Sequence, residues 1–368
     1  MLALQLMGGL RSLRTACLGA CVAVGLAHAQ PASIAATAPT APAAQKLRVV
    51  GGLAGINQFT RNEEPFWSKE LARLSGGKYT ADIVPFDRAG VPGSDMLHLM
   101  ELGVIPLGTA LLSTASSQYP EYGAPDLAGL NPDFASIRKT VAAFRPYLQK
   151  SLRDAHGIEM LAIYTYPAQV LFCKKAIAGL SDLAGRRIRV ASATQSDFVS
   201  ALGGVPVLVG FAQVLPNMAS GNTECAITGT MTGFTMGLHE VTQFVHRMPI
   251  TWGLAIFGAN QAAWNALPGD LRALLSRELP KLEAAIWNES ERETQEGFAC
   301  NRGAESCAVA RKGKMAEVAT SENDERLRRE IFTNVVLPRW LQRCNNRCLD
   351  LWNKTIGPAQ GIVAQAAK

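Results

Sequence analysis

The segment 187–228, RIRVASATQSDFVSALGGVPVLVGFAQVLPNMASGNTECAIT, is the most informative about fold class. Short apolar runs alternate in it with stretches of helical periodicity, and Gly221 follows the second helical stretch as a cap. The expected strands are 187–191, 206–209 and 224–228, and the expected helices are 195–202 and 212–219. Strands that alternate with helices are typical of an α/β unit built on a parallel sheet.

The chain on either side extends this pattern. After the segment, 268–295 predicts a helix of about 40 Å, kinked at Pro280. Two successive α/β units, and a helix long enough to pack against both, predict a chain of two domains, which its length also favours. Before the segment we expect strands at 47–50, 79–85, 104–112, 158–164 and 168–173, and helices at 63–74 and 94–102.

The first 46 residues predict export. A basic start, a short apolar run and an A-x-A triplet form the order of a secretory signal peptide, 1–29, cleaved between Ala29 and Gln30. A lipoprotein-like box ending at Cys21 is the alternative, but it leaves too short an apolar region before it. Residues 30–46, almost all Ala, Pro, Thr, Ser and Gln, predict a flexible leader. We therefore expect an exported, periplasmic protein.

Charge and motifs exclude several classes of function. Without the two arginines of the signal peptide the formal charge falls from +6 to +4, with no basic block that would favour nucleic-acid binding. His239-Glu240 begins like a zinc-protease motif, but Gln243 stands where the second histidine belongs. The sequence has no G-x-S-x-G elbow, no P-loop and no G-x-G-x-x-G order. We expect neither an enzyme nor a cofactor.

Six cysteines follow the signal peptide, and an oxidising compartment favours disulfides. The C-x6-C and C-x3-C spacings do not fit common zinc modules, so we expect no metal site. The spacing favours bridges between Cys300 and Cys307 and between Cys344 and Cys348, although connectivity stays open. For Cys173 and Cys225 we expect buried thiols on neighbouring strands.

Three arginines crowd the start of the strand at 187, and one of them is a candidate ligand anchor. Arg186 and Arg187 come at its amino end, where solvated charge is ordinary. Arg189 comes near its carboxyl end, where parallel sheets bind ligands. Its planar fork matches a carboxylate with two hydrogen bonds. From its position in the strand alone, a structural ion pair is the alternative role for Arg189.

Residues 179–229, GLSDLAGRRIRVASATQSDFVSALGGVPVLVGFAQVLPNMASGNTECAITG, closely resemble the solute-binding receptors of TRAP transporters, the DctP family. That family typically shows a D-L-x-G-x-K-I-R-V block, a G-A-x-P-V segment before a phenylalanine, and a G-x-V-D-G-x-E-N strand. The segments GGKYTADIVPF and WNALPGDLRALL also match, and the similarity runs from about residue 47 to about 280.

The resemblance implies a periplasmic-binding-protein fold of type II, with a ligand cleft between two α/β lobes and a long helix packing against both. It implies lobe I from 47–165 with 252–288, and lobe II from 166–251 with 289–368, including the cysteine-rich C-terminal segment. Such a receptor closes around a small organic acid and delivers it to the small and large membrane subunits of the transporter. For the C-terminal segment we expect no role in binding.

The resemblance also assigns site residues. Arg189 matches the carboxylate-binding arginine, and Phe211 matches the phenylalanine that packs on the ligand. Gln169 stands where members binding more polar acids carry a second arginine, and Thr228 replaces the asparagine of the family strand. With a single strong anchor, we expect a monocarboxylate with an apolar or aromatic body. Further expected contacts are Asn57, Gln58, Phe59, Tyr166 and Trp252.

Two other functions are compatible with the same residues. The first is an ABC-type or orphan binding protein with another membrane partner. The second is an exported enzyme on the same fold, for which the sequence offers no nucleophile–base pair.

Overall fold

The computed structural model describes residues 45–366 except Asn346. The expected signal peptide, 1–29, and nearly all of the expected leader, 30–46, lie outside these residues. Within the described part, no helix combines the length and the apolar character that crossing a membrane requires.

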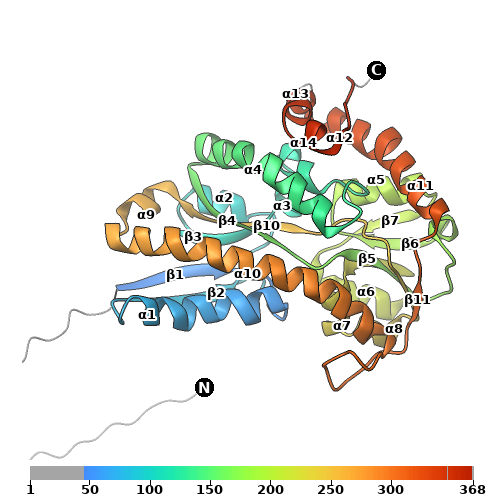
Figure 1. Ribbon diagram of the computed structural model, residues 1–368, viewed down its shortest axis with the longest axis horizontal. Helices are drawn as coiled ribbons and strands as arrows, with labels where there is room; N and C mark the ends of the chain where they lie inside the picture. The colour runs from blue at the N-terminus through green and yellow to red at the C-terminus, as the bar shows by residue number, and fades with distance from the viewer. Residues whose placement is uncertain (1–44, 346, 367–368) are drawn as a thin grey trace, which may run out of the picture. The chain divides into compact units, whose positions relative to one another are not determined.

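Lobe I is built on a five-stranded sheet in the order β2-β1-β3-β10-β4 (Figure 1). β1 pairs in parallel with β2 and β3, whereas β10 runs antiparallel to β3 and β4. The strands are β1 (Gln45–Gly51), β2 (Tyr79–Pro85), β3 (Leu107–Leu111), β4 (Ile158–Thr165) and β10 (Leu254–Asn260). The helical turns Gln58–Glu63 and Phe66–Glu70 lead into α1 (Leu71–Leu74). The other helices of lobe I are α2 (Met96–Glu101), α3 (Leu112–Ala115), the short segment Pro120–Asp126, α4 (Phe134–His156) and α9 (Gln261–Ala266).

Lobe II is built on a six-stranded sheet in the order β11-β9-β5-β8-β6-β7. β6 pairs in parallel with β7 and β8, and β5 runs antiparallel to β8 and β9. The strands are β5 (Gln169–Cys173), β6 (Arg187–Val190), β7 (Val205–Leu208), β8 (Cys225–Gly229), β9 (Phe244–His246) and β11 (Ala316–Val318). The helices are the turn Leu180–Leu183, α5 (Ala193–Ala201), the turn Phe211–Gln213, α6 (Val214–Ser220), α7 (Thr230–Thr235) and α8 (Leu238–Val241).

Both sheets are mixed, which corrects the parallel sheets that we expected. Two extended segments cross between the lobes, one after β4 and one before β10, and these two crossings pair antiparallel at Gln169 and Thr251. β5 follows the first crossing and β10 follows the second, and both strands run antiparallel to their neighbours in the sheet. The α/β architecture of two lobes is otherwise as expected.

The long helix α10 (Gly269–Arg302) packs against both lobes (Figure 1). On lobe I, its Trp287 Nε1 donates to Ile163 O at 2.8 Å, and its Ser290 Oγ donates to Thr165 O at 2.7 Å. On lobe II, Asn301 Nδ2 donates to Thr230 O at 3.0 Å. The helix continues through Pro280 and ends seven residues beyond the expected end at 295.

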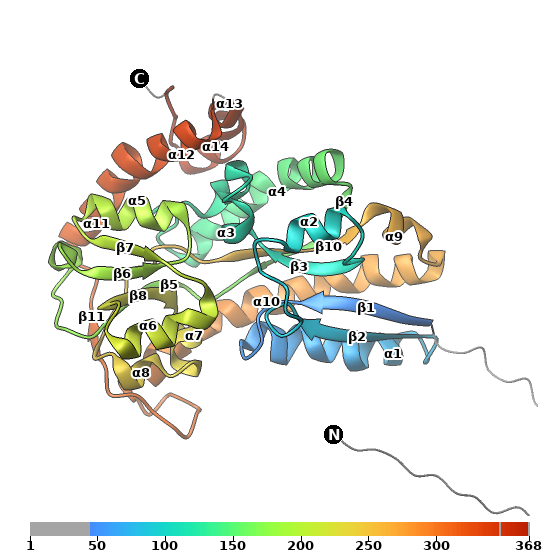
Figure 2. The same ribbon diagram turned by 180° about the vertical axis from the view of Figure 1, so that it is seen from behind.

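The C-terminal segment contacts both lobes, as Figure 2 shows for its helices. It comprises α11 (Glu322–Ile331), the turn Phe332–Val336, α12 (Leu337–Cys344), α13 (Arg347–Lys354) and α14 (Ile356–Gln360). On lobe II, Asp324 accepts from Leu180 N at 2.7 Å. On lobe I, Trp340 Nε1 donates to Pro120 O at 2.7 Å, and Gln360 Nε2 donates to Thr140 Oγ1 at 2.6 Å. The segment that we assigned to lobe II thus lies across both lobes.

Three disulfides join described cysteines. Cys300–Cys307 and Cys344–Cys348 are the local pairs that the spacing favoured. Cys173 is bonded to Cys225, which corrects the expectation of free thiols there. The two residues lie directly opposite each other in the antiparallel pair β5–β8, so their side chains meet.

Candidate ligand-binding site

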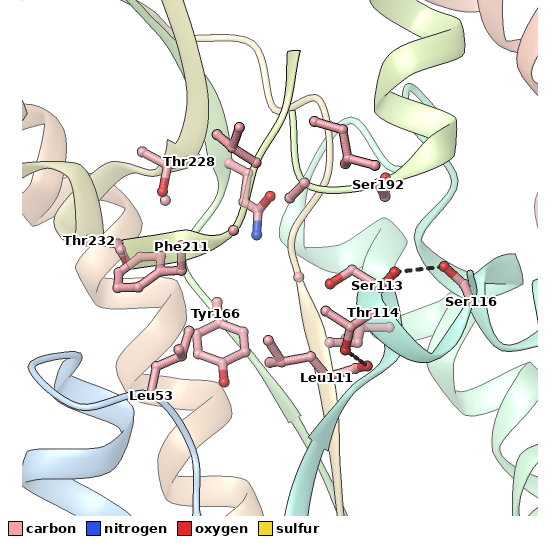
Figure 3. Close-up of a pocket in the computed structure, with 18 of the residues that line it drawn as sticks. Leu53, Leu111, Ser113, Thr114, Ser116, Tyr166, Ser192, Phe211, Thr228 and Thr232 are labelled. Atoms are coloured by element: carbon pink, nitrogen blue, oxygen red, sulfur yellow. Dashed lines mark hydrogen bonds between the residues drawn. The ribbon is translucent and has the colours of Figure 1, made fainter. Parts of the chain in front are cut away.

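A cavity of about 340 Å³ lies between the two lobes (Figure 3). Lobe I contributes Leu53, Ile56, Ser94 and Leu111 with Ser113, Thr114, Ser116 and Ser117. The crossings contribute Tyr166, Gln169, Gly253 and Leu254. Lobe II contributes Arg189, Phe211, Thr228 and Thr232 with residues 191–193, 208–210 and Gly229. A volume at the small end of ligand pockets, with mostly apolar walls and polar side chains from both lobes, fits a small molecule that is oriented by polar contacts.

The three neighbouring arginines have three different environments. Arg186 donates to Lys175 O and Ala176 O, and Arg187 donates to Gly221 O and Asn222 O, so both hold exposed loops at the amino end of β6. Arg189 alone lines the cavity. It sits in β6 between the fully buried side chains of Ile188 and Val190, at the carboxyl end of the strand.

Arg189 is a buried cation, only 4% exposed. Its Nη1 donates to Ile227 O at 2.8 Å, and its Nε donates to Val209 O at 3.1 Å. Burial lowers the pKa of its guanidinium to about 10, so it stays charged at neutral pH, and no described carboxylate offsets that burial. Since an unpaired buried charge is costly, the arrangement is suited to an anion entering the cavity.

Gln169 lies at the point where the two crossings pair, and its side chain is held by lobe II. Its Oε1 accepts from Gln195 Nε2 and from Thr251 Oγ1, both at 3.0 Å. Gln195 is fixed in turn, because its Oε1 accepts from Ala191 N at 2.7 Å at the start of α5. With its oxygen doubly occupied, Gln169 has its Nε2 left as a donor at the cavity.

Gly253 lets the second crossing pass close to Gln169. Its φ of +78° belongs to the left-handed region, which glycine adopts without a steric penalty. A Cβ at this position would lie 2.6 Å from Gln169 Nε2 and 3.2 Å from Tyr166 Cδ2. The carboxylate of Asp126 holds the same turn by accepting from Trp252 N at 2.9 Å and Gly253 N at 2.7 Å.

A second, much smaller cavity of about 30 Å³ adjoins the first. The two share eight lining residues, including Ser113 and Gln169. Asp126 and Arg343 line only the small cavity. Burial raises the pKa of Asp126 to about 7. Arg343, from the C-terminal segment, pairs with Asp197 at 2.6 Å.

Five of the expected contacts, Arg189, Gln169, Phe211, Thr228 and Tyr166, line the large cavity. The other four, Asn57, Gln58, Phe59 and Trp252, lie outside its lining, so ligand contact is not supported for them.

The four outlying residues have structural partners instead. Asn57 Nδ2 donates to Glu293 Oε1 on α10. Gln58 Nε2 donates to the buried Glu63 at 2.7 Å, and Phe59 is buried behind β1. Trp252 Nε1 donates to Asn131 O at 3.1 Å, and its ring packs on that of Phe134.

Sequence reasoning missed several polar residues of the cavity, among them Ser113 and Thr232. In Figure 3 the hydroxyl of Ser113 points into the open space, and Thr228, Thr232 and Phe211 lie across from it. Ser113 follows the carboxyl end of β3, so the rule that singled out Arg189 in lobe II could have found it.

Metal binding is not favoured at the one described group with suitable spacing. Ligand atoms of Glu121, Cys344 and Cys348 lie within 4.8 Å of one another. The two sulfurs are joined in a disulfide and are not thiolate ligands.

Residues 56–302 match the model of a protein family described as bacterial extracellular solute-binding protein, family 7 (DctP). Over 216 residues the chain is 21% identical to the C4-dicarboxylate-binding periplasmic protein DctP of Rhodobacter capsulatus. That alignment covers 57% of this chain and 64% of the relative's length, slightly less than two thirds.

Solved structures share the fold. DctP7, an extracytoplasmic solute receptor of Bordetella pertussis binding pyroglutamic acid, has a TM-score of 0.74 and 20% identity, covering 84% of this chain and 99% of that one. A TRAP periplasmic solute-binding protein of Sulfurospirillum deleyianum with bound succinate has a TM-score of 0.73 and 16% identity, covering 87% and 99%. These relatives are binding proteins that hold different acids on one architecture.

Proposed function

The chain belongs to family 7 of the bacterial extracellular solute-binding proteins, and from this premise we propose that it is the periplasmic receptor of a TRAP-type transporter for a monocarboxylic acid. The export signal expected at 1–29 supports the periplasmic location. The receptor binds the acid between its lobes and presents it to the membrane subunits.

Arg189 carries this proposal. It is the buried cation of the large cavity, its fork is oriented by two main-chain carbonyls, and no carboxylate is among its described partners. A carboxylate in the cavity would neutralise it through charge-assisted hydrogen bonds of the kind that guanidinium groups form best. Solute-binding receptors of this family also include proteins that bind organic acids, as the relatives above do.

A single negative charge on the ligand is favoured by the other lining residues. No second cationic side chain lines the large cavity in the described chain, and the position opposite Thr251 is the neutral Gln169. A second carboxylate would lose its hydration without a countercharge, which is costly. Leu53, Tyr166 and Phe211 supply apolar surface for the body of the acid.

Closure of the lobes completes the proposal. Since lobe I and lobe II both line the cavity, an acid that contacts both stabilises the closed arrangement by its differential affinity for it. The membrane subunits then recognise the closed form.

Titration calorimetry on the secreted protein tests the anchor. We first identify binders by thermal shift in a panel of aliphatic and aromatic monocarboxylates, with dicarboxylates beside them. An acid at 100 times its Kd adds about 2.7 kcal/mol, a shift of several degrees. Arg189→Ala should abolish binding of every such acid, and Arg189→Lys should also fail because a point charge does not reproduce the fork.

Arg187→Ala is the matched control, since Arg187 lies two residues away on the same strand and outside the cavity lining. It should keep wild-type affinity. Retained affinity in Arg189→Ala would refute the anchor, and a preference for dicarboxylates would refute the single-charge argument.

A further inference from the structure

The hydroxyl groups of the cavity fall into two kinds. Several are used within the protein: Thr114 Oγ1 donates to Gly93 O, Ser116 Oγ to Ser113 O, and Ser117 Oγ to Thr114 O. Ser192 Oγ accepts from Gln195 N as the cap of α5. In contrast, the hydroxyls of Ser113, Tyr166, Thr228 and Thr232 bond to no other described residue, and that of Tyr166 is fully buried. The hydroxyls of Ser113, Thr228 and Thr232 are therefore free to contact a ligand.

The free groups lie at two different ends of the site. Arg189, Thr228 and Thr232 line only the large cavity, whereas Ser113 and Gln169 line both cavities and so mark the end where the two join. Ser113 comes from lobe I, and Figure 3 shows it across the open space from Thr228 and Thr232. An acid held at Arg189 thus extends its other end toward Ser113 and Gln169.

The end at Ser113 and Gln169 offers donors without net positive charge. Gln195 and Thr251 occupy the oxygen of Gln169, which leaves its Nε2 to donate. Arg343 on the adjoining wall is paired with Asp197. The carboxyl group of Asp126 also lines this end and would repel a second carboxylate whenever it is ionised.

We infer that this end selects an uncharged hydrogen-bond acceptor on the ligand, such as a carbonyl, amide or hydroxyl oxygen, with Ser113 and Gln169 as its donors. The inference rests on the proposed function, because it takes the carboxylate to be at Arg189. An acid with only hydrocarbon at this end leaves both donors unpaired in a site from which it has displaced water. Such loss lowers affinity by roughly tenfold or more.

Matched pairs of monocarboxylates test the inference by calorimetry. The pairs differ in one carbonyl or hydroxyl group: 3-oxocyclopentanecarboxylate with cyclopentanecarboxylate, 4-oxopentanoate with pentanoate, and 4-hydroxybenzoate with benzoate. In the wild type, the polar member of a bound pair should bind about tenfold or more tightly. Ser113→Ala should reduce that ratio severalfold through weaker binding of the polar member, with the apolar member little changed.

Ser68→Ala is the matched control. It makes the same change in lobe I, but Ser68 lies outside both cavities and its hydroxyl donates to Glu64 O, so the ratio should stay at the wild-type value. Equal affinities within pairs, or an unchanged ratio in Ser113→Ala, overturn the inference while leaving the anchor intact if Arg189→Ala still abolishes binding. Retained binding of both members by Arg189→Ala overturns the proposed function instead, and this inference with it.

Discussion

Replacing Gly253 by alanine should destabilise the protein for two separable reasons. Alanine in the left-handed region, here at φ +78°, costs about 1–2 kcal/mol. Its Cβ would also lie 2.6 Å from Gln169 Nε2 and 3.2 Å from Tyr166 Cδ2, and overpacking of this kind costs about 1–3 kcal/mol. We therefore expect a loss of about 2–5 kcal/mol in the free energy of unfolding.

Urea unfolding of the ligand-free protein, followed by tryptophan fluorescence, measures this loss. Gly185→Ala is the control for strain alone, because Gly185 has a φ of +74° and no neighbouring atom lies within 4 Å of the place that an added Cβ would take. It should cost about 1–2 kcal/mol. The difference between the two variants then isolates the close approach to Gln169 and Tyr166.

A double-mutant cycle with Gln169→Ala identifies the colliding group. Removing the Gln169 side chain removes the atom at 2.6 Å, so Gly253→Ala should cost about 1–3 kcal/mol less in that background. Additive costs, or a loss in Gly253→Ala no larger than in Gly185→Ala, would refute the reasoning.

Two further predictions concern stability. Burial raises the pKa of the Glu63 carboxyl to about 7. Between pH 4.5 and 7 the folded protein therefore keeps the carboxyl proton that the unfolded chain has lost. The free energy of unfolding consequently falls as the pH rises through that window. Glu63→Gln should flatten the slope of unfolding free energy between pH 5 and 7 by up to about 1.4 kcal/mol per pH unit, and an unchanged slope in urea titrations would contradict this. Replacing both cysteines of the bridge Cys173–Cys225 by alanine should lower the free energy of unfolding by about 4 kcal/mol, because the bridge joins residues 52 positions apart. The same change at Cys300–Cys307, with a separation of 7, should lower it by about 2.5 kcal/mol. Equal losses in urea unfolding would count against the loop-length argument.

Local patterns in the sequence were sufficient for much of the fold. The strand predicted at 79–85 is β2, and the strand predicted at 187–191 is β6 within one residue. The helix α4 was missed although its signal is present: Asp133 caps it, and buried residues recur along it every three or four positions. What local patterns did not supply was strand direction, since a short apolar run such as β5, predicted at 168–173, looks alike in parallel and antiparallel sheets.

Local patterns leave the arrangement of distant segments undetermined, and this limit also explains the outcome at the site and at the cysteines. The place of Arg189 in the cavity lining could be predicted because it stands near the carboxyl end of a strand, where α/β sheets bind ligands. The place of Phe59 outside that lining could not be predicted, because Phe59 lies in a helical turn, where sequence distance from a strand does not fix the direction of a side chain. Cys173 and Cys225 were expected on neighbouring strands, but their bond also requires that they stand directly opposite each other in the pair β5–β8, a register between residues 52 positions apart that local patterns do not give.

The way in which Arg189 is held has a consequence for how such a site can diversify. Its orientation depends on the main-chain oxygens of Val209 and Ile227, which every replacement of those side chains would leave in place. In the proposed receptor, the charge that captures an acid is thereby independent of the side chains that choose among acids. Mutations at Ser113, Thr232 or Phe211 would then change the preferred acid one step at a time, while each intermediate protein keeps its anchor.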